Sequence, residues 1–328
     1  MGITSTKTCT ALDQPIRDYL AHQRALGRCY RREETTLLSL RDFLVRVGST
    51  ELDLDVFERW CQLHEQLSGN VRRHRQRVAR NLCLYRRRSE PSCFVPDSNR
   101  FPRPHPHQPP VIFGPDAVAR MLDAAQHMAP APGSPLRPWV MRMAVTLLYT
   151  AGLRRRELVR LTMADVDASA GVLHVRETKF HKSRWVPLST DAKREVRAYL
   201  RQRLAPSLSP APESPFLCNT NGGLRGYTGA GLAEGIQKLF AAAEVRGWDG
   251  RRPRVHDMRH SFAIGCLLRW YREGADVQSN LPKLAMYMGH VSIESTAYYL
   301  RWMPELAQAA SERFENVFGH VVATGDVL

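Results

Sequence analysis

Four short stretches of the 328-residue chain contain side chains that can bind an anion and move protons. They are "TAGLRRRELVRLTMADVD" (150–167), "TKFHKSRWVPL" (178–188), "HDMRHSFA" (256–263) and "MGHVSIESTAYY" (288–299). Guanidinium groups match the oxygens of a phosphate, and lysine and histidine can transfer protons at a reacting oxygen. A tyrosine oxygen can serve as a nucleophile. The combination indicates side-chain chemistry on a phosphodiester.

Arg154 and Arg259 supply two guanidinium groups for the nonbridging oxygens of such a phosphate. Glu157 follows Arg154 by one helical turn and can hold that arginine in place. His260 and His290 can donate further hydrogen bonds to the same oxygens. These residues together predict a cationic site in which negative charge is stabilised as it develops.

A metal site is the main alternative for the histidines. His256 and His260 are four residues apart, a spacing that can place two ligands on one helix face. The stretch lacks the glutamate of the His-Glu-x-x-His motif, and Arg259 between the histidines would repel a cation. No GxxxxGK phosphate-binding loop occurs in the sequence. We therefore expect no metal and no other cofactor.

In their order and spacing, the stretches resemble the tyrosine recombinase (phage integrase) family, over about residues 115–303 and more weakly before that. The arginine and the acid of the family's Thr-Gly-Leu-Arg-x-x-Glu-Leu box match Arg154 and Glu157, although Arg156 replaces the common serine. The family's Leu-Gly-His box matches residues 288–290, with Met288 in place of leucine. Its His-x-x-Arg-His box matches His256, Arg259 and His260.

The resemblance also assigns a lysine and a nucleophile. The family's hairpin lysine matches Lys179, and Lys182 is a rival for the same role. The family's nucleophilic tyrosine follows the last histidine by nine residues, which selects Tyr299 after His290. Adjacent residues on a helix point about 100° apart, so Tyr298 and Tyr299 cannot both face one phosphate. We expect Tyr298 to pack its helix against the core.

The implied function is site-specific DNA recombination through a 3′-phosphotyrosyl intermediate, without metal or ATP. Lys179 would protonate the leaving 5′ oxygen, and His256 would help to accept the tyrosine proton. The implied partner is double-stranded DNA with specific sites, bound by a homo-tetramer and, in some systems, by other recombinases or accessory proteins. Two alternatives stay open: a catalytically silent DNA-binding relative and a type IB topoisomerase-like activity.

The elements that must position these residues suggest a mainly α fold. We expect a helical core-binding (SAM-like) domain over 1–92, a linker over 93–113, and a mostly helical catalytic domain with a small antiparallel β-sheet over 114–303. Eight of the 21 prolines fall within 91–115, and proline disfavours helix. The C-terminal stretch 304–328 carries one apolar stripe that could dock on a neighbouring subunit or fold back: Leu306, Ala310, Phe314, Val317 and Phe318.

In the first domain, residues 71–88 read as a helix with an apolar stripe at Val71, Val78, Leu82 and Tyr85. The arginines that fall mostly off this stripe could lie along DNA phosphates: Arg72, Arg73, Arg75, Arg77 and Arg80. Two more helices are expected at 16–27 and 33–48, the second ending at Gly48.

In the catalytic domain, helices are expected over 114–125, over 137–152 with a stop at Gly152, and over 190–204. Residues 172–177 and 184–188 form a predicted hairpin. A loop is expected over 205–230, and helix from about 231 onward. The second of these helices has a predicted buried face made by Trp139, Val140, Met143, Ala144, Leu147 and Leu148.

The charge of the chain agrees with a polyanionic partner. The net charge is +15, from 47 basic and 32 acidic residues. Residues 1–110 have 19 basic and 12 acidic residues, giving +7, and the rest carries +8. This excess favours nucleic acid over a membrane as the partner. No apolar run approaches a membrane span, the start lacks a secretory pattern, and the seven cysteines include no Cys-x-x-Cys pair. We expect a reduced cytoplasmic protein associated with the nucleoid.

Overall fold

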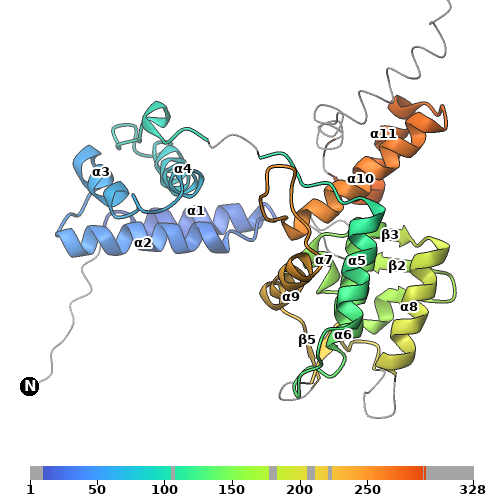
Figure 1. Cartoon of the computed structure of the whole chain (residues 1–328). Helices are drawn as coiled ribbons and strands as arrows, with labels where there is room; N and C mark the ends of the chain where they lie inside the picture. Colours follow the sequence, from blue (N-terminus) through green and yellow to red (C-terminus); the bar gives the residue numbers. More distant parts are fainter. Residues whose placement is uncertain are drawn as a thin grey trace, which may run out of the picture. The chain divides into compact units, whose positions relative to one another are not determined.

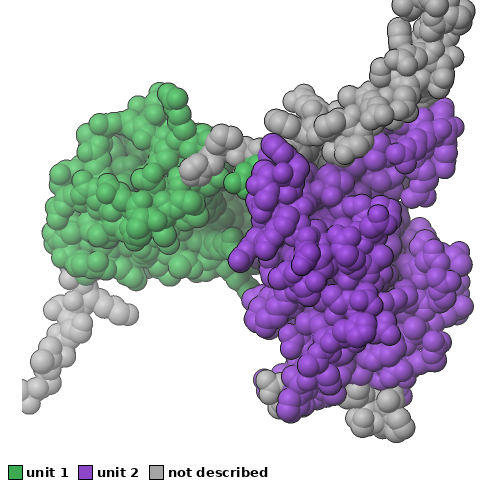
Figure 2. All heavy atoms as spheres, viewed as in Figure 1, with its two compact units in different colours: residues 1–108 green, residues 109–328 purple. Residues whose placement is uncertain are grey.

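Two compact units make up the chain in the computed structural model, residues 1–108 and residues 109–328 (Figure 2). The structure describes residues 10–104, 108–176, 183–204, 211–220, 224–290 and 292. Both units are mainly helical, and the strands form small antiparallel sheets in the second (Figure 1). The predicted fold class, mainly α with a small antiparallel sheet, is confirmed.

The first unit consists of α1 (Asp13–Ala25), α2 (Arg31–Val47), α3 (Leu54–Gln62), α4 (Gly69–Arg86) and the short 3₁₀ helix η1 (Ser98–Arg100). The predicted stop of α2 is confirmed: Gly48 has φ +69°, a conformation that glycine adopts without strain. The sequence prediction lacked α3, whose first turn is capped by the Asp53 carboxylate accepting from the Val56 amide at 2.8 Å.

The apolar stripe predicted for α4 is correct at Val78 and Leu82, which are buried in the core of the first unit. It is wrong at Val71, which is 43% exposed because it lies in the first turn of the helix, at the edge of the bundle. The stretch after α4 packs against the same core through Phe94 and Phe101. Part of the predicted linker is therefore integrated into the first unit.

The second unit begins with helices α5 (Pro115–Gln126), α6 (Arg137–Thr150) and α7 (Arg155–Leu158), and the 3₁₀ helix η2 (Met163–Asp165). Strands β1 (Val166–Asp167), β2 (Val172–Val175) and β3 (Arg184–Pro187) follow, then α8 (Thr190–Arg203) and strands β4 (Cys218–Asn219) and β5 (Arg225–Gly226). It continues with α9 (Gly229–Ala242), α10 (Val255–Arg272) and α11 (Val277–Met288).

The predicted hairpin is confirmed as β2 and β3, which pair antiparallel with Val175 opposite Arg184. The short strand β1 adds to the other edge of β2, giving the order β1-β2-β3. Helix α8 begins where it was predicted, because the Ser189 hydroxyl accepts a hydrogen bond from the Ala192 amide.

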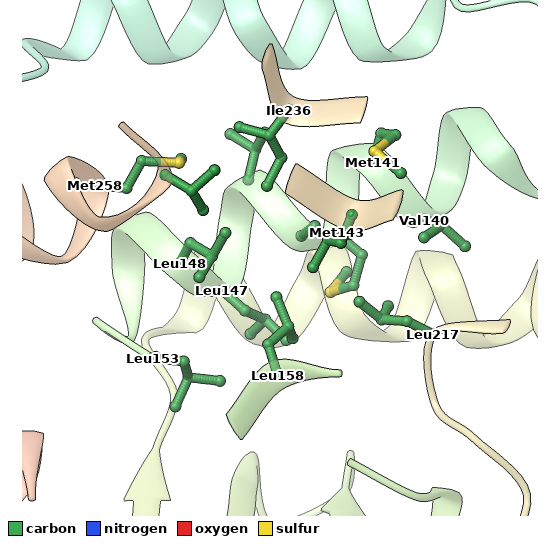
Figure 3. Packing of buried hydrophobic residues seen from close by; sticks show 14 of the residues in the cluster. Val140, Met141, Met143, Leu147, Leu148, Leu153, Leu158, Leu217, Ile236 and Met258 are labelled. Atoms are coloured by element: carbon green, nitrogen blue, oxygen red, sulfur yellow. The ribbon is translucent and has the colours of Figure 1, made fainter. Parts of the chain in front are cut away.

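Helix α6 lies at the centre of the second unit's core. Val140, Met143, Leu147 and Leu148 of α6 are at most 1% exposed and pack with side chains from α7, α9 and α10 (Figure 3). Trp139 was predicted on this face but is 36% exposed, so that prediction is wrong: it lies near the start of the helix, where the core ends.

Two predictions after residue 204 need correction. The predicted loop 205–230 contains the paired strands β4 and β5. The helix predicted from about 231 onward is interrupted over 243–254, where Gly250 adopts φ +76° and Pro253 precedes α10, and again over 273–276. Among the described residues, no helix is long and apolar enough to cross a membrane.

Candidate active site

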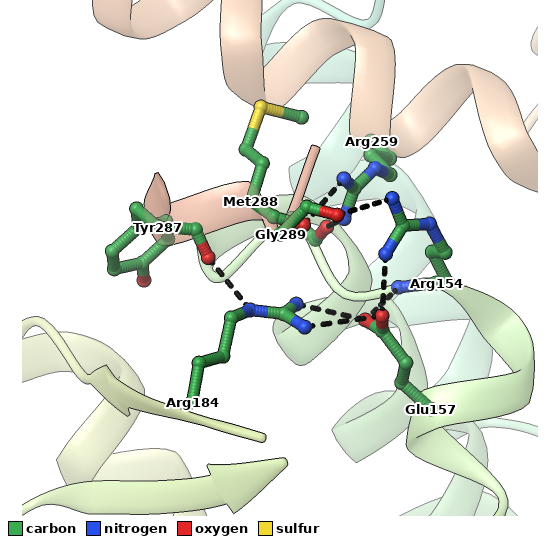
Figure 4. Close-up of polar contacts among 8 residues, drawn as sticks. Arg154, Glu157, Arg184, Arg259, Tyr287, Met288 and Gly289 are labelled. Atoms are coloured by element: carbon green, nitrogen blue, oxygen red, sulfur yellow. Dashed lines mark hydrogen bonds and ion pairs between the residues drawn. The ribbon is translucent and has the colours of Figure 1, made fainter. Parts of the chain in front are cut away.

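Three arginines converge on the C-terminal end of α11. The last carbonyl groups of a helix have no partner within the helix. Here Arg184 Nε donates to the Tyr287 carbonyl at 2.8 Å, Arg259 Nη2 to the Met288 carbonyl at 2.6 Å, and Arg154 Nη2 to the Gly289 carbonyl at 2.8 Å (Figure 4). Arg184 lies on β3 and Arg259 on α10, and Arg154 immediately precedes α7. Segments far apart in the sequence thus meet immediately before His290.

The Glu157 carboxylate joins two of these arginines. Its side chain is 5% exposed. Its oxygens accept from Arg154 Nη1 at 2.7 Å and from the Arg154 amide at 2.9 Å, which confirms the predicted contact between these residues. They also accept from Arg184 Nη1 at 3.1 Å and Nη2 at 2.9 Å. Burial would raise the pKa of Glu157, but the hydrogen bonds and charge of Arg184, with those of Arg154, hold the pKa at about 2.

Arg259 and Arg154 differ in exposure. Arg259 is 1% exposed, and its Nη1 donates to the Gly152 carbonyl at 2.5 Å, so it connects the α6–α7 turn to the end of α11. The side chain of Arg154 is 30% exposed. Arg154 is therefore the more accessible of the two predicted phosphate-binding arginines.

Two glycines make this close packing possible. Gly152 has φ +58°, and a Cβ there would lie 2.4 Å from a ring carbon of Phe262. Gly289 has φ +67°, and a Cβ there would lie 2.8 Å from Nη1 of Arg184. A side chain at either position would be strained and would displace its neighbour. The α11 turn at Gly289 also directs the chain toward His290, whose amide donates to the Ala285 carbonyl at 2.9 Å.

The histidines are close to this cationic cluster. His256 and His260 lie one turn apart on α10, with ring centroids 4.7 Å apart. Desolvation, and then the positive charge of Arg259, lower the pKa of His256 to about 4, although the residue as a whole is exposed. Desolvation and the charges of Arg259 and Arg154 lower the pKa of His290 to about 4 as well. Both rings are therefore neutral near pH 7.

The charges of the residues drawn in Figure 4 favour an anionic ligand. They include three guanidinium groups but only one carboxylate, that of Glu157, which pairs with two of them. Nearby, the Asp257 carboxylate is paired with Arg254 at 2.9 Å. The excess positive charge and the N–H groups suit the oxygens of a phosphate. Within the described ranges there is no group of three or more residues of the types that hold a metal ion.

The structure brings together Arg154, Glu157, Arg259 and His290, and places His256 and His260 on the same helix as Arg259. Four predicted residues lie outside the described residues, as does the C-terminal stripe within 304–328. They are Lys179, Lys182, Tyr298 and Tyr299.

Sequence reasoning missed Arg184. Its position on the predicted return strand could have indicated that its side chain points inward. Arg184 and the buried Val186 are two residues apart and so share one face of β3. A buried arginine requires an acceptor, and the Glu157 carboxylate was already in the predicted site.

The arginines predicted to contact DNA in α4 are used in different ways. Arg73 Nη1 donates to the Pro102 carbonyl at 3.0 Å, and Arg80 donates to the Pro96 carbonyl. These two arginines hold the stretch after α4 against the first unit. Arg77 is exposed, whereas Arg72 and Arg75 are half-buried.

Comparisons with known proteins identify relatives of this chain. The Phage integrase family profile matches residues 113–305. The chain is 32% identical over 309 residues to y4rB of Sinorhizobium fredii (strain NBRC 101917 / NGR234), provisionally named an integrase/recombinase, covering 92% of this chain and 96% of that protein. It is 31% identical over 206 residues to the tyrosine recombinase XerD of Caulobacter vibrioides (strain ATCC 19089 / CIP 103742 / CB 15), covering 62% and 61%.

Among solved structures, the Tn1549 transposon integrase in complex with a circular intermediate DNA has the same fold, with a TM-score of 0.62 at 18% sequence identity. The match covers 91% of this chain and 99% of that one. The family profile covers more than half of the chain, and y4rB matches it along nearly the whole length. This chain therefore belongs to the phage integrase family.

Proposed function

We propose that the chain is a tyrosine-type, site-specific DNA recombinase that cleaves and rejoins DNA through a 3′-phosphotyrosyl intermediate. The observation that carries this proposal is the convergence of Arg154, Arg184 and Arg259 on three successive carbonyls immediately before His290. A cationic site with oriented N–H groups stabilises the charge that develops on a transferring phosphate. The family match supports it by extending through residue 305, beyond both tyrosines.

In the proposed reaction, the Tyr299 oxygen attacks the phosphorus and the bond to the 5′ oxygen breaks. Lys179 gives a proton to that leaving oxygen, and His256 helps to accept the tyrosine proton. The lowered pKa of His256 leaves the ring neutral near pH 7, so one ring nitrogen is free to accept a hydrogen bond from the tyrosine hydroxyl as its proton leaves. Rejoining is the reverse attack by a 5′ hydroxyl on the phosphotyrosine, which conserves the energy of the bond.

The phosphate would be held mainly by Arg154, with Arg259 adding positive charge and His260 and His290 donating hydrogen bonds. The substrate would be double-stranded DNA with specific sites, and the active assembly a homo-tetramer on two duplexes. The names of the relatives, integrase/recombinase and transposon integrase, support a role in the movement of a mobile element. We place the protein in the cytoplasm, at the nucleoid.

The first experiment identifies the DNA site. The purified chain is incubated with sheared DNA of the organism that encodes it, covalent adducts are trapped with denaturant, and the attached DNA ends are sequenced. One recurrent sequence is expected. That sequence then defines a duplex nicked next to the cleavage position, on which the covalent adduct accumulates because the short cleaved fragment diffuses away.

The second experiment tests the nucleophile on that nicked duplex. Tyr299→Phe should bind the DNA but form no adduct, whereas Tyr298→Phe, the matched control, should still form it. Mass spectrometry of the wild-type adduct should place the nucleotide on Tyr299. An adduct that persists in Tyr299→Phe and maps to Tyr298 contradicts the assignment. Specific binding without any adduct identifies a silent DNA-binding relative, and supercoil relaxation without recombinant product identifies a topoisomerase.

A further inference from the structure

Arg184 connects three parts of the site. Its side chain is only 11% exposed. Its two terminal nitrogens contact both oxygens of Glu157, at 3.1 and 2.9 Å, and its Nε donates to the Tyr287 carbonyl at 2.8 Å (Figure 4). The planar guanidinium of Arg184 therefore connects β3 with the Glu157 carboxylate and with the C-terminal end of α11.

Arg184 and Arg154 share the Glu157 carboxylate, and each contacts both of its oxygens, Arg154 through Nη1 and its backbone amide. Oxygen Oε1 of Glu157 accepts from both arginines, at 2.7 Å from Arg154 and 3.1 Å from Arg184. A two-point contact with a planar fork fixes the plane of a carboxylate, which a single-point contact does not. The orientation of the carboxylate, together with the Gly289 carbonyl, determines where the Arg154 guanidinium lies.

A second ion pair near the same hairpin provides a comparison. Arg176, the residue after β2, pairs through Nε with Asp165, whose side chain is also 5% exposed. The Asp165 carboxylate also accepts from the Thr162 amide at 2.9 Å and from the Thr162 hydroxyl at 3.0 Å. Among the described residues, the contacts of this pair stay within residues 162–176 and do not reach α11 or Arg154. It is also an arginine paired with a buried carboxylate, but the contact is single and the Arg176 side chain is 44% exposed, and the pair has no connection to the site.

We propose that Arg184 is a positioning residue for strand cleavage: it fixes the Glu157 carboxylate, and through it the Arg154 guanidinium, in the orientation that receives the phosphate. The contact with Tyr287 fixes the end of α11 that leads to His290 at the same time. Lysine cannot replace this arginine, because a single ammonium cannot make a fork contact with the carboxylate and also donate along a third direction to the carbonyl. The inference rests on the proposed function and deepens it.

The test measures the rate of adduct formation in single turnover on the nicked duplex described above, and separately the DNA affinity. The variants are Arg184→Lys, Arg184→Gln and Glu157→Gln, with Arg176→Gln as the matched control. We expect Arg184→Lys to slow adduct formation about 10- to 100-fold, the range for a catalytic group misplaced by about an ångström. DNA affinity should change less than about threefold. Arg176→Gln should react within about twofold of wild type.

Two further measurements separate positioning from loss of fold. Thermal unfolding should show that Arg184→Lys is folded at the assay temperature, and the comparison is made with Arg176→Gln, which also loses an ion pair with a buried carboxylate. The double variant Arg184→Lys with Glu157→Gln should be slowed by much less than the product of the two single effects, since both act through the same carboxylate.

A substrate with sulfur at the leaving 5′ position identifies the step that Arg184 serves. Because this substrate needs little proton donation, it should not rescue Arg184→Lys if the defect lies in Arg154. Rescue would overturn the proposal and connect Arg184 with the hairpin lysine. A folded Arg184→Lys that reacts like wild type would also overturn it. The absence of any adduct from wild type would instead refute the proposed function, so the two failures are distinguishable.

Discussion

His256 and His290 are uncharged near pH 7 because their surroundings disfavour a further positive charge. Desolvation is the largest cause in both cases, and the guanidinium of Arg259 is the next. A neutral imidazole can accept a proton through one nitrogen and donate a hydrogen bond through the other. The arginines therefore contribute twice: they attract an anion, and they keep the two rings in the protonation state that the proposed reaction requires.

The lowered pKa values of His256 and His290 predict how the stability of the fold depends on pH. An unfolded histidine has a pKa of about 6.5, so between pH 6.5 and 4 the unfolded chain binds more protons than the folded chain. The folded state should therefore lose stability as the pH falls through this window. Because both rings are partly open to solvent, we expect a modest loss of about 1 kcal/mol between pH 7 and 5.

Denaturant unfolding at a series of pH values measures this effect. His290→Gln cannot take up a proton, so its free energy of unfolding should change less steeply over the same interval. A wild-type protein that is more stable at pH 5 than at pH 7, or a variant with an unchanged slope, would contradict the prediction.

Lys179 is tested through the leaving group. Lys179→Ala should slow cleavage of normal DNA about 100-fold or more, the usual contribution of a general acid, with little change in binding. A substrate with a 5′ sulfur leaving group should be cleaved by this variant at nearly the wild-type rate. Equal losses on both substrates would make Lys182 the candidate acid.

Local spacing was sufficient to predict some contacts of the site but not others. Arg154 and Glu157 are three residues apart, so one helical turn brings them together. The partner of Arg184 is 27 residues away in sequence, and its carbonyl partner 103 residues away. No local rule relates such positions, and a backbone carbonyl has no side-chain signature in the sequence. The resemblance to a family was sufficient to predict which residues form the site. The contacts among those residues could be found only from the folded structure.

The boundaries of helices were also predicted well where a local interaction sets them and poorly where long-range packing sets them. Helix ends marked by capping residues were predicted well, as at Gly48 and Ser189, because capping is a local interaction. Helix α3 and the break over 243–254 were missed. Both are short and depend on packing against neighbouring elements, as shown by buried Val56 and Phe57 in α3 and Val245 in the break.

Gly152 gives a prediction about the turn between α6 and α7. Gly152→Ala would combine a strained left-handed backbone with a contact of 2.4 Å to the Phe262 ring, and we expect it to lower the free energy of unfolding by about 2–4 kcal/mol. The matched control is Gly274→Ala at the end of α10, where φ is +70° and the Cβ would meet no atom within 4 Å. That change should cost only about 1–2 kcal/mol, from backbone strain alone.

Denaturant unfolding of the two variants isolates the packing term as their difference. Equal losses would show that the Phe262 ring moves aside freely, and that Gly152 matters only for its backbone conformation.

Both units are basic, at +7 for residues 1–110 and +8 for the remainder. If both bind DNA phosphates, affinity should fall steeply with salt, with a slope of log affinity against log salt of about −0.9 per phosphate neutralised. Arg77→Gln should reduce the magnitude of this slope by about one unit and weaken binding to all sequences alike, because Arg77 is exposed on α4.

The control for this measurement is Arg73→Gln, since Arg73 is bound to the Pro102 carbonyl within the first unit. Arg73→Gln should lower the free energy of unfolding and leave the salt slope of DNA affinity almost unchanged. A nearly flat salt dependence of the wild-type chain would argue against phosphate binding by both units.

The arginine–carbonyl contacts at the end of α11 also affect the entropy of the proposed reaction. An arginine side chain held in one orientation loses roughly 2 kcal/mol of rotamer entropy. Arg154 and Arg259 are already held by the Gly289 and Met288 carbonyls, so this loss occurs when the chain folds. An arriving phosphate does not have to order these side chains. For two arginines the difference is at most about 4 kcal/mol, or roughly a thousandfold in rate, and the carbonyls of one helix end supply it together with the Glu157 carboxylate and the Gly152 carbonyl.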